Sequence, residues 1–176
     1  MVTDPGDFMI VSRMRRSMLG MMKRSYFLLI AAAASTAACT PGAPSAPNGS
    51  VRSGAVVIHA SFGKFIIQTQ YGLLSSYSPN PLVVARGTVV QFVNDDNFDH
   101  TATSLGTSGF PQSGPGGSAQ TRSGNDLAQP NWSTGVLTGG AISQTLNAST
   151  PGTYYFGCFF HYATPGSPMR GVIVVQ

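Results

Sequence analysis

The sequence contains no glutamate and few charged residues of any kind. Charged residues make up 9% of the chain, and a single lysine, Lys64, follows residue 38. Glutamate and lysine are good helix formers, so their scarcity argues against a helical domain. Short runs of Val, Ile, Tyr, Phe and Thr between Gly, Ser and Pro are typical of strands joined by turns. We therefore expect an all-β fold.

The chain beyond its N-terminal segment also lacks a cluster of basic residues. Residues 1–38 hold five basic and two acidic residues, a net charge of +3. Residues 39–176 hold five basic and four acidic residues, a net charge of +1. Nucleic-acid-binding domains concentrate Lys and Arg on one face of the folded part. This distribution argues against nucleic acid as a partner.

Long apolar runs are missing, and the one apolar run near the N-terminus is short. Residues 26–34 follow Lys23 and Arg24 and precede small residues, which is the order of a secretory signal peptide. A membrane-spanning helix needs about 20 apolar residues, whereas only fourteen residues separate Arg24 from Cys39. We therefore expect residues 1–38 to be a leader with a signal peptide, and the remainder to be exported.

The end of this leader resembles a bacterial lipobox. In Thr36-Ala-Ala-Cys39, Cys39 stands where the lipidated first residue is found, although Thr36 replaces the usual Leu. Plain cleavage near Ala38 is the alternative. Because Met21 or Met22 would each begin a complete signal peptide, we interpret residues 1–20 as the result of a start codon assigned too early.

The segment after the leader indicates how the domain is attached. Residues 39–53 are rich in Pro, Gly, Ala and Ser, and we expect a flexible tether there. The folded domain should then comprise residues 54–176. We expect it at the cell surface or in the periplasm, in contact with the membrane only through the lipid on Cys39.

Short apolar segments predict an antiparallel β-sandwich of seven or eight strands. A thirty-residue stretch, 104–133, is rich in Gly, Ser, Gln and Pro and fits no strand pattern. Such a long segment is usually either functional or disordered. The strands are expected at residues 56–60, 64–71, 82–85, 88–94, 100–103, 141–146, 153–158 and 171–175.

Cysteine, histidine and methionine are scarce in the predicted domain. If Cys39 is consumed in the leader, Cys158 is an unpaired thiol in an exported protein and needs a reason such as metal ligation. His161 stands three residues after Cys158, and His100 follows a predicted strand. Met169 is the only methionine beyond residue 22. The alternatives are a buried inert thiol and a methionine that fills the core.

Two imidazoles, one thiolate and one thioether form the ligand set of a blue, type 1 copper site. His100, Cys158, His161 and Met169 are therefore the candidate ligands of one copper ion per chain. A Cys₂His₂ zinc site is excluded because the second cysteine is missing. We interpret the remaining histidine, His59, as a structural or surface residue. A multicopper enzyme needs further histidines, so we expect a protein that is not an enzyme.

Five segments form a pattern that is more specific than the ligands alone. They are residues 77–94, His100-Thr-Ala-Thr (100–103), Trp-Ser-Thr-Gly-Val-Leu (132–137), Pro-Gly-Thr-Tyr-Tyr-Phe-Gly-Cys-Phe-Phe-His (151–161) and Pro-Met-Arg-Gly-Val-Ile-Val-Val (168–175). Together they resemble the cupredoxins of the plastocyanin and pseudoazurin kind over residues 55–176, apart from 104–133. The resemblance implies an eight-stranded Greek-key sandwich.

The same resemblance implies a specific arrangement of the site. Cys158, His161 and Met169 would share one loop at one end of the sandwich. His161 would lie near the surface in an apolar patch through which electrons enter or leave. The candidates for this electron-transfer patch are Phe159, Phe160 and Tyr162, and the alternative is that these aromatic side chains belong to the core.

Two features differ from the family pattern. Seven residues, 162–168, separate His161 from Met169, where the family commonly has four. Thr101 follows His100, where many members have an Asn that braces the ligand loop. The longer loop bears on the contact between Met169 and copper, and the Thr101 hydroxyl would have to replace part of the bracing.

The function expected from these residues is one-electron transfer. We expect a monomeric carrier that cycles between Cu(II) and Cu(I) in the cell envelope and exchanges electrons with redox proteins. The alternative is a copper storage or delivery protein, although such proteins often contain several Met or Cys and this domain has one Met. A metal-free binding module is the third possibility, and it would take up no copper.

Overall fold

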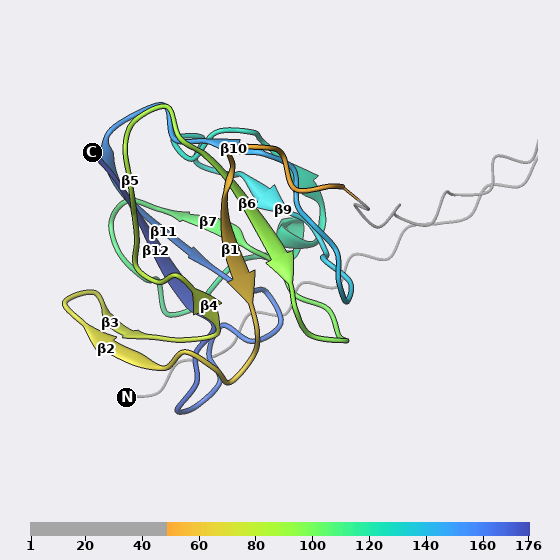
Figure 1. The fold of residues 1–176 in the computed structure, drawn as a ribbon. Coiled ribbons are helices and arrows are strands. Elements are labelled where there is room, and N and C mark those ends of the chain that lie inside the picture. Colours follow the sequence, from red (N-terminus) through yellow and green to blue (C-terminus); the bar gives the residue numbers. More distant parts are fainter. Residues whose placement is uncertain (1–48) are drawn as a thin grey trace, which may run out of the picture. The chain divides into compact units, whose positions relative to one another are not determined.

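The computed structural model describes residues 49–176, and β-strands dominate this range (Figure 1). The expected all-β fold is confirmed, and one 3₁₀-helix, η1 (Gly117–Gln120), is present besides the strands. The predicted leader and Cys39 lie outside the described residues. The strands are β1 (Val56–Ala60), β2 (Ile67–Thr69), β3 (Gly72–Leu74), β4 (Tyr77–Ser78), β5 (Leu82–Val84), β6 (Val89–Asn94), β7 (Thr103–Gly106), β8 (Arg122–Ser123), β9 (Ser133–Thr134), β10 (Leu146–Asn147), β11 (Gly152–Gly157) and β12 (Arg170–Val175).

Two sheets pack against each other. One has the strand order β10-β6-β1-β4 and the other β5-β12-β11-β7-β9-β8, and β2 and β3 form a separate hairpin. In Figure 1, β1 and β6 run in front of β11 and β12. Most neighbours are antiparallel, but β1 pairs in parallel with β6, and β5 with β12. The parallel pairs arise because the chain leaves the first sheet after β4, adds β5 to the other sheet and returns as β6.

Aromatic side chains from both sheets fill the core. Phe92 of β6 contacts Phe156 of β11 with ring centroids 5.2 Å apart, and Tyr77 lies 4.8 Å from Phe156. Trp132 stacks on Phe92 at 6.1 Å, and all four side chains are fully buried. Burial of large aromatic side chains dominates the stabilisation of such a core. These four side chains therefore hold β6 and β11 firmly together.

The stretch 104–133 is an ordered part of the domain. It contains η1 and β8, and Leu127 and Trp132 from it are buried in the core. The Ser133 hydroxyl, at its edge, donates to the Ala119 carbonyl at 2.7 Å. Its apolar residues are too widely spaced to show a period, and this is why the sequence pattern did not reveal its packing.

Several predicted strands are shorter than expected. Only 67–69 of the segment 64–71 and only 146 of the segment 141–146 lie in strands, although Ile142 forms an isolated bridge with Val93. His100 pairs with Leu137 through another isolated bridge instead of beginning β7. The backbone at His100 therefore pairs with Leu137, and the regular strand β7 begins only at Thr103.

Two further findings concern the N-terminal side of the domain and the membrane. Residues 49–53, which belong to the predicted tether, are exposed, and the Arg52 N–H donates to Gln91 Oε1 at 2.6 Å. His59 in β1 is half exposed and lies 3.0 Å from Asp95, in agreement with a structural or surface role. Within residues 49–176, no helix is long and apolar enough to cross a membrane.

Candidate metal centre

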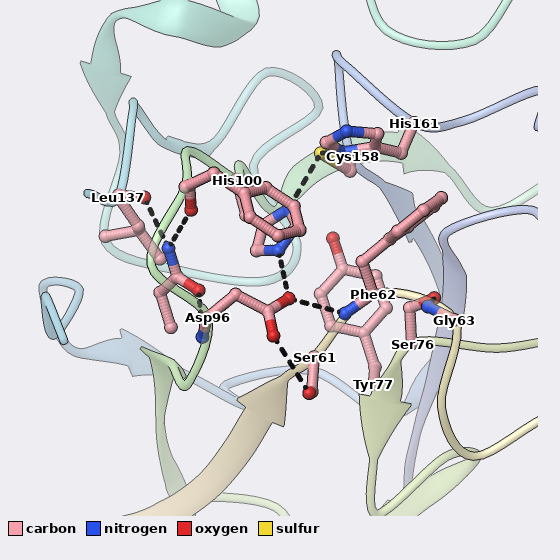
Figure 2. A network of polar contacts seen from close by, with 12 residues as sticks. Ser61, Phe62, Gly63, Ser76, Tyr77, Asp96, His100, Leu137, Cys158 and His161 are labelled. Carbon is pink, nitrogen blue, oxygen red and sulfur yellow. Dashed lines mark hydrogen bonds and ion pairs between the residues drawn. The ribbon is translucent and has the colours of Figure 1, made fainter. Parts of the chain in front are cut away.

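Three of the four predicted ligands lie together at one end of the sandwich. A ligand atom from each of His100, Cys158 and His161 lies within 4.8 Å of the other two. Cys158 Sγ is 3.9 Å from His100 Nδ1 and 3.7 Å from His161 Nδ1. Figure 2 shows the sulfur and the two rings turned toward one another. It is the one such group of His, Cys and acidic side chains among the described residues.

The loop between β11 and β12 holds three of the predicted ligands. Cys158 directly follows β11, and its N–H donates to the Met169 carbonyl at 3.1 Å. The Met169 N–H in turn donates to the His161 carbonyl at 3.0 Å. These two hydrogen bonds join the ends of the loop. The Met169 backbone therefore stays beside Cys158 and His161, although the seven residues 162–168 lie between His161 and Met169. Met169 is fully buried in the same core cluster as Cys158.

His100 follows β6, and hydrogen bonds with Leu137 and Asp96 fix its backbone and its ring. Its N–H donates to the Leu137 carbonyl at 3.0 Å, and its carbonyl accepts the Leu137 N–H at 2.8 Å. The Asn94 side-chain amide also donates to Leu137 O, at 2.8 Å. On the ring, Nε2 lies 2.7 Å from Asp96 Oδ2, which leaves Nδ1 facing Cys158. The His100 side chain is thus buried and fixed in one orientation.

Thr101 links the His100 segment to the cysteine loop. Its N–H points at Cys158 Sγ at 3.4 Å, and its hydroxyl accepts the Phe159 N–H at 2.8 Å. Its carbonyl accepts the Tyr77 hydroxyl at 2.6 Å. The hydroxyl of Thr101 therefore braces the ligand loop, although Thr101 stands where many cupredoxins have an Asn.

Burial shifts the pKa values of two of the clustered side chains, Cys158 and His161. Burial raises the pKa of the Cys158 thiol, while N–H groups of Thr101, Phe160 and His161 act in the opposite direction. Burial, together with the neighbouring His100, lowers the pKa of His161, so its imidazole is neutral near pH 7. A buried sulfur that accepts N–H bonds needs a positive charge beside it to be a thiolate.

The acid closest to the cluster is Asp96. Burial acts to raise the pKa of Asp96, but hydrogen bonds from His100, Phe62 and Ser61 outweigh it and leave the pKa below its ordinary value. Asp96 is therefore a carboxylate at neutral pH. It was absent from the predicted site residues because its relation to His100, four residues away, becomes visible only once the turn between β6 and His100 is formed.

The donor set fits copper. One sulfur and two imidazole nitrogens, close together and mostly buried, match the ligands that type 1 copper prefers. A structural zinc site would usually have four such protein ligands. The neutral imidazole of His161 is the form that coordinates a metal. Cys158 is also a free thiol in the described residues, so no disulfide competes for it.

The predicted electron-transfer patch needs one correction. Phe160 is 41% exposed and Phe159 is half-buried, but Tyr162 is only 4% exposed. Its ring lies beneath the Arg170 guanidinium, 4.2 Å from the ring centroid, and its hydroxyl donates to the Pro111 carbonyl. Tyr162 therefore braces the loop and does not contribute to the surface.

Two other phenylalanines, which the sequence analysis missed, surround His161. The ring centroid of Phe62 lies 4.5 Å from that of His161, and Phe98 lies 5.7 Å from it. Phe98 is 42% exposed and shares a shallow hollow with Phe160 and His161. The position of Phe98, two residues before His100, could have indicated that it lies near the site. No sequence feature near Phe62 connects that residue with the site.

Several solved structures are similar to this chain. A reduced amicyanin mutant aligns with a TM-score of 0.43 and 19% identity over 72% of this chain and 86% of that chain. An oxidised amicyanin mutant gives 0.44 and 19% over the same shares. A purple cupredoxin from Nitrosopumilus maritimus gives 0.42 and 22%, over 69% of this chain and 99% of that chain.

Comparisons of sequence gave no match. No protein-family model matches the chain, and no curated protein does. Only the side chains of the centre itself therefore indicate a metal and which metal it is.

Proposed function

We propose that this protein is a type 1 copper electron carrier and that His100, Cys158 and His161 bind one copper ion, with Met169 as a fourth and weaker ligand. The observation that carries the proposal is the gathering of one thiol and two imidazoles within 4.8 Å. When bound, copper would supply a centre that accepts and releases one electron as Cu(II) and Cu(I).

The protein's own contribution is to hold the ligands still. Main-chain bonds to Leu137 fix His100, and the Thr101 N–H and hydroxyl fix Cys158 and the loop after it. Ligands held in this way by packing and by hydrogen bonds cannot rearrange freely. A site of fixed geometry changes little between oxidation states, so the cost of reorganisation in electron transfer stays small.

His161 is the ligand best placed to connect the centre with a partner. It is partly exposed, and Phe98 and Phe160 lie beside it at the surface. Aromatic rings exclude water from the surroundings of the ring and offer an apolar contact area. We propose that redox proteins dock here, that the protein acts as a monomer and that it is not an enzyme.

The N-terminal sequence supports a proposal for the place of action. The signal-peptide pattern of residues 23–38 and the lipobox-like Cys39 support export and a lipid anchor. We propose a location in the cell envelope, in the periplasm or at the cell surface. Burial of His100, Cys158 and Met169 favours a carrier over a copper storage or delivery protein, because a delivery protein must release copper readily.

Repeated redox cycling distinguishes these functions. The copper-loaded protein is reduced and reoxidised in the presence of a strong Cu(I) chelator, and copper retained on the chain is measured after each cycle. A carrier keeps one copper per chain through all cycles and gives a reversible one-electron wave in voltammetry. Stepwise loss of copper to the chelator on reduction would support copper delivery instead.

A further inference from the structure

Asp96 lies outside the predicted ligand set, yet its carboxylate contacts one of the ligands. Its Oδ2 is 2.7 Å from His100 Nε2, while Nδ1 of the same ring faces Cys158 Sγ at 3.9 Å. In Figure 2, His100 lies between Asp96 on one side and Cys158 on the other. The two ring nitrogens thus have separate tasks, one toward the metal position and the other toward the carboxylate.

Other donors hold the Asp96 carboxylate in place. Ser61 Oγ donates to Oδ1 at 3.2 Å, and the Phe62 N–H donates to Oδ2 at 2.6 Å. The Asp96 backbone is held as well, because its N–H donates to Asn94 Oδ1 at 3.0 Å. The Asp96 side chain is only 13% exposed, and the His100 side chain is fully buried. Rotation of the carboxylate away from His100 would therefore break several hydrogen bonds at once.

This contact has two chemical consequences for His100. A neutral imidazole that coordinates through Nδ1 carries its proton on Nε2, and Asp96 is placed to accept that proton in a hydrogen bond. A carboxylate bonded in this way also makes the imidazole a stronger electron donor to a metal. Because the pair is mostly shielded from water, its negative charge acts more strongly on the centre than an exposed charge would.

We propose that Asp96 is a positioning residue that holds His100 in its Nε2–H tautomer and lowers the reduction potential of the copper centre by stabilising Cu(II) more than Cu(I). The inference depends on the copper-binding function proposed above. The change of oxidation state involves one electron, supplied by a redox protein or an electrode. The proton remains on His100 Nε2 in both oxidation states.

The chain provides a matched control in the neighbouring residue. Asp95 carries the same charge, but it is 41% exposed and pairs with His59 at 3.0 Å. Asp95→Asn therefore removes one negative charge directly beside Asp96 in the sequence, without removing the contact between Asp96 and His100. Ser61→Ala is the second control, because it removes one support of Asp96 and leaves the carboxylate in place.

The main experiment compares the copper-loaded variants by voltammetry and by competition with a Cu(II) chelator. Asp96→Asn is expected to raise the reduction potential clearly more than either Asp95→Asn or Ser61→Ala. It is also expected to weaken Cu(II) binding by about 10- to 100-fold. If Asp96→Asn remains blue but its potential equals that of Asp95→Asn, the inference about Asp96 is wrong and the copper function still stands.

A measurement on the metal-free protein tests the tautomer separately. Nitrogen-15 NMR of His100 at pH 8 should show the proton on Nε2 in the wild type and a larger share of the Nδ1–H tautomer in Asp96→Asn. A wild-type protein with the proton on Nδ1 would overturn the inference even if Asp96→Asn does not fold. Failure of the wild type to form a blue copper complex would count against the proposed function, whichever tautomer NMR finds.

Discussion

At the scale of single residues, the centre depends most on Cys158. Its side chain is fully buried, it is a free thiol, and the Thr101 N–H points at its sulfur. A sulfur that is merely a small core group would be exchangeable for another small group, whereas a copper ligand would not. Substitution of Cys158 by Ser separates these two roles.

For Cys158→Ser we expect complete loss of the intense blue absorption, because this band requires a thiolate bonded to copper. The two imidazoles remain, so weak and colourless Cu(II) binding persists. Optical spectroscopy after copper addition measures the loss, and circular dichroism of the metal-free variant controls for folding. A variant that still turns blue would show that another sulfur or another site binds the metal.

Met169 has two possible roles that a substitution can separate. It could bind copper, or it could only fill the core, where it is fully buried. For Met169→Leu we expect the blue band to remain and the reduction potential to rise, since a weak donor to Cu(II) is lost. Leu and Met have similar volumes, so the free energy of unfolding should fall by less than about 1.5 kcal/mol. Voltammetry and urea denaturation measure the two quantities. An unchanged potential would mean that Met169 only fills the core.

At the scale of elements, the stretch 104–133 supports the loop that holds the ligands. A Cβ on Gly114 would clash with the Tyr162 ring, 2.6 Å from its Cγ atom, and Gly114 has φ +66°. The Tyr162 hydroxyl bonds to Pro111, and Arg170 lies over the Tyr162 ring. Tyr162 of the ligand loop therefore contacts both this stretch and Arg170 of β12. These contacts hold the loop in place even though seven residues separate His161 from Met169.

Gly114→Ala tests this support. The added methyl group clashes with Tyr162 and strains the backbone, so we expect the free energy of unfolding to fall by about 1–3 kcal/mol and copper binding to weaken. Gly116→Ala is the matched control, because its Cβ would meet nothing within 4 Å and its φ is ordinary. Chemical denaturation and copper competition measure both variants. Equal effects of the two substitutions would contradict a supporting role for Gly114.

At the scale of the whole molecule, the sequence predicted the sheet fold well and the site in part. The segments 56–60, 88–94 and 171–175 were predicted as strands because apolar and β-branched residues cluster between clear turn signals, and they agree with β1, β6 and β12 to within one residue at each end. Cys158 and His161 are neighbours in sequence, and scarcity identified His100. The parallel pairs of strands depend on how the chain crosses between sheets, which local patterns do not encode.

Other parts of the site could not be predicted from local sequence. Phe62 and Asp96 reach the centre only through tertiary packing, because β1 and β6 lie side by side. Tyr162 was expected at the surface, since sequence does not show that Gly114 leaves space for its ring. Residues far apart in the chain determine both outcomes.

The most direct test of the account is an optical titration of the purified protein with Cu(II). We predict an intense blue charge-transfer band that saturates at one copper per chain and disappears on reduction. A protein that stays colourless, or that binds copper weakly without this band, would contradict the assignment of His100, Cys158 and His161 as a type 1 copper site.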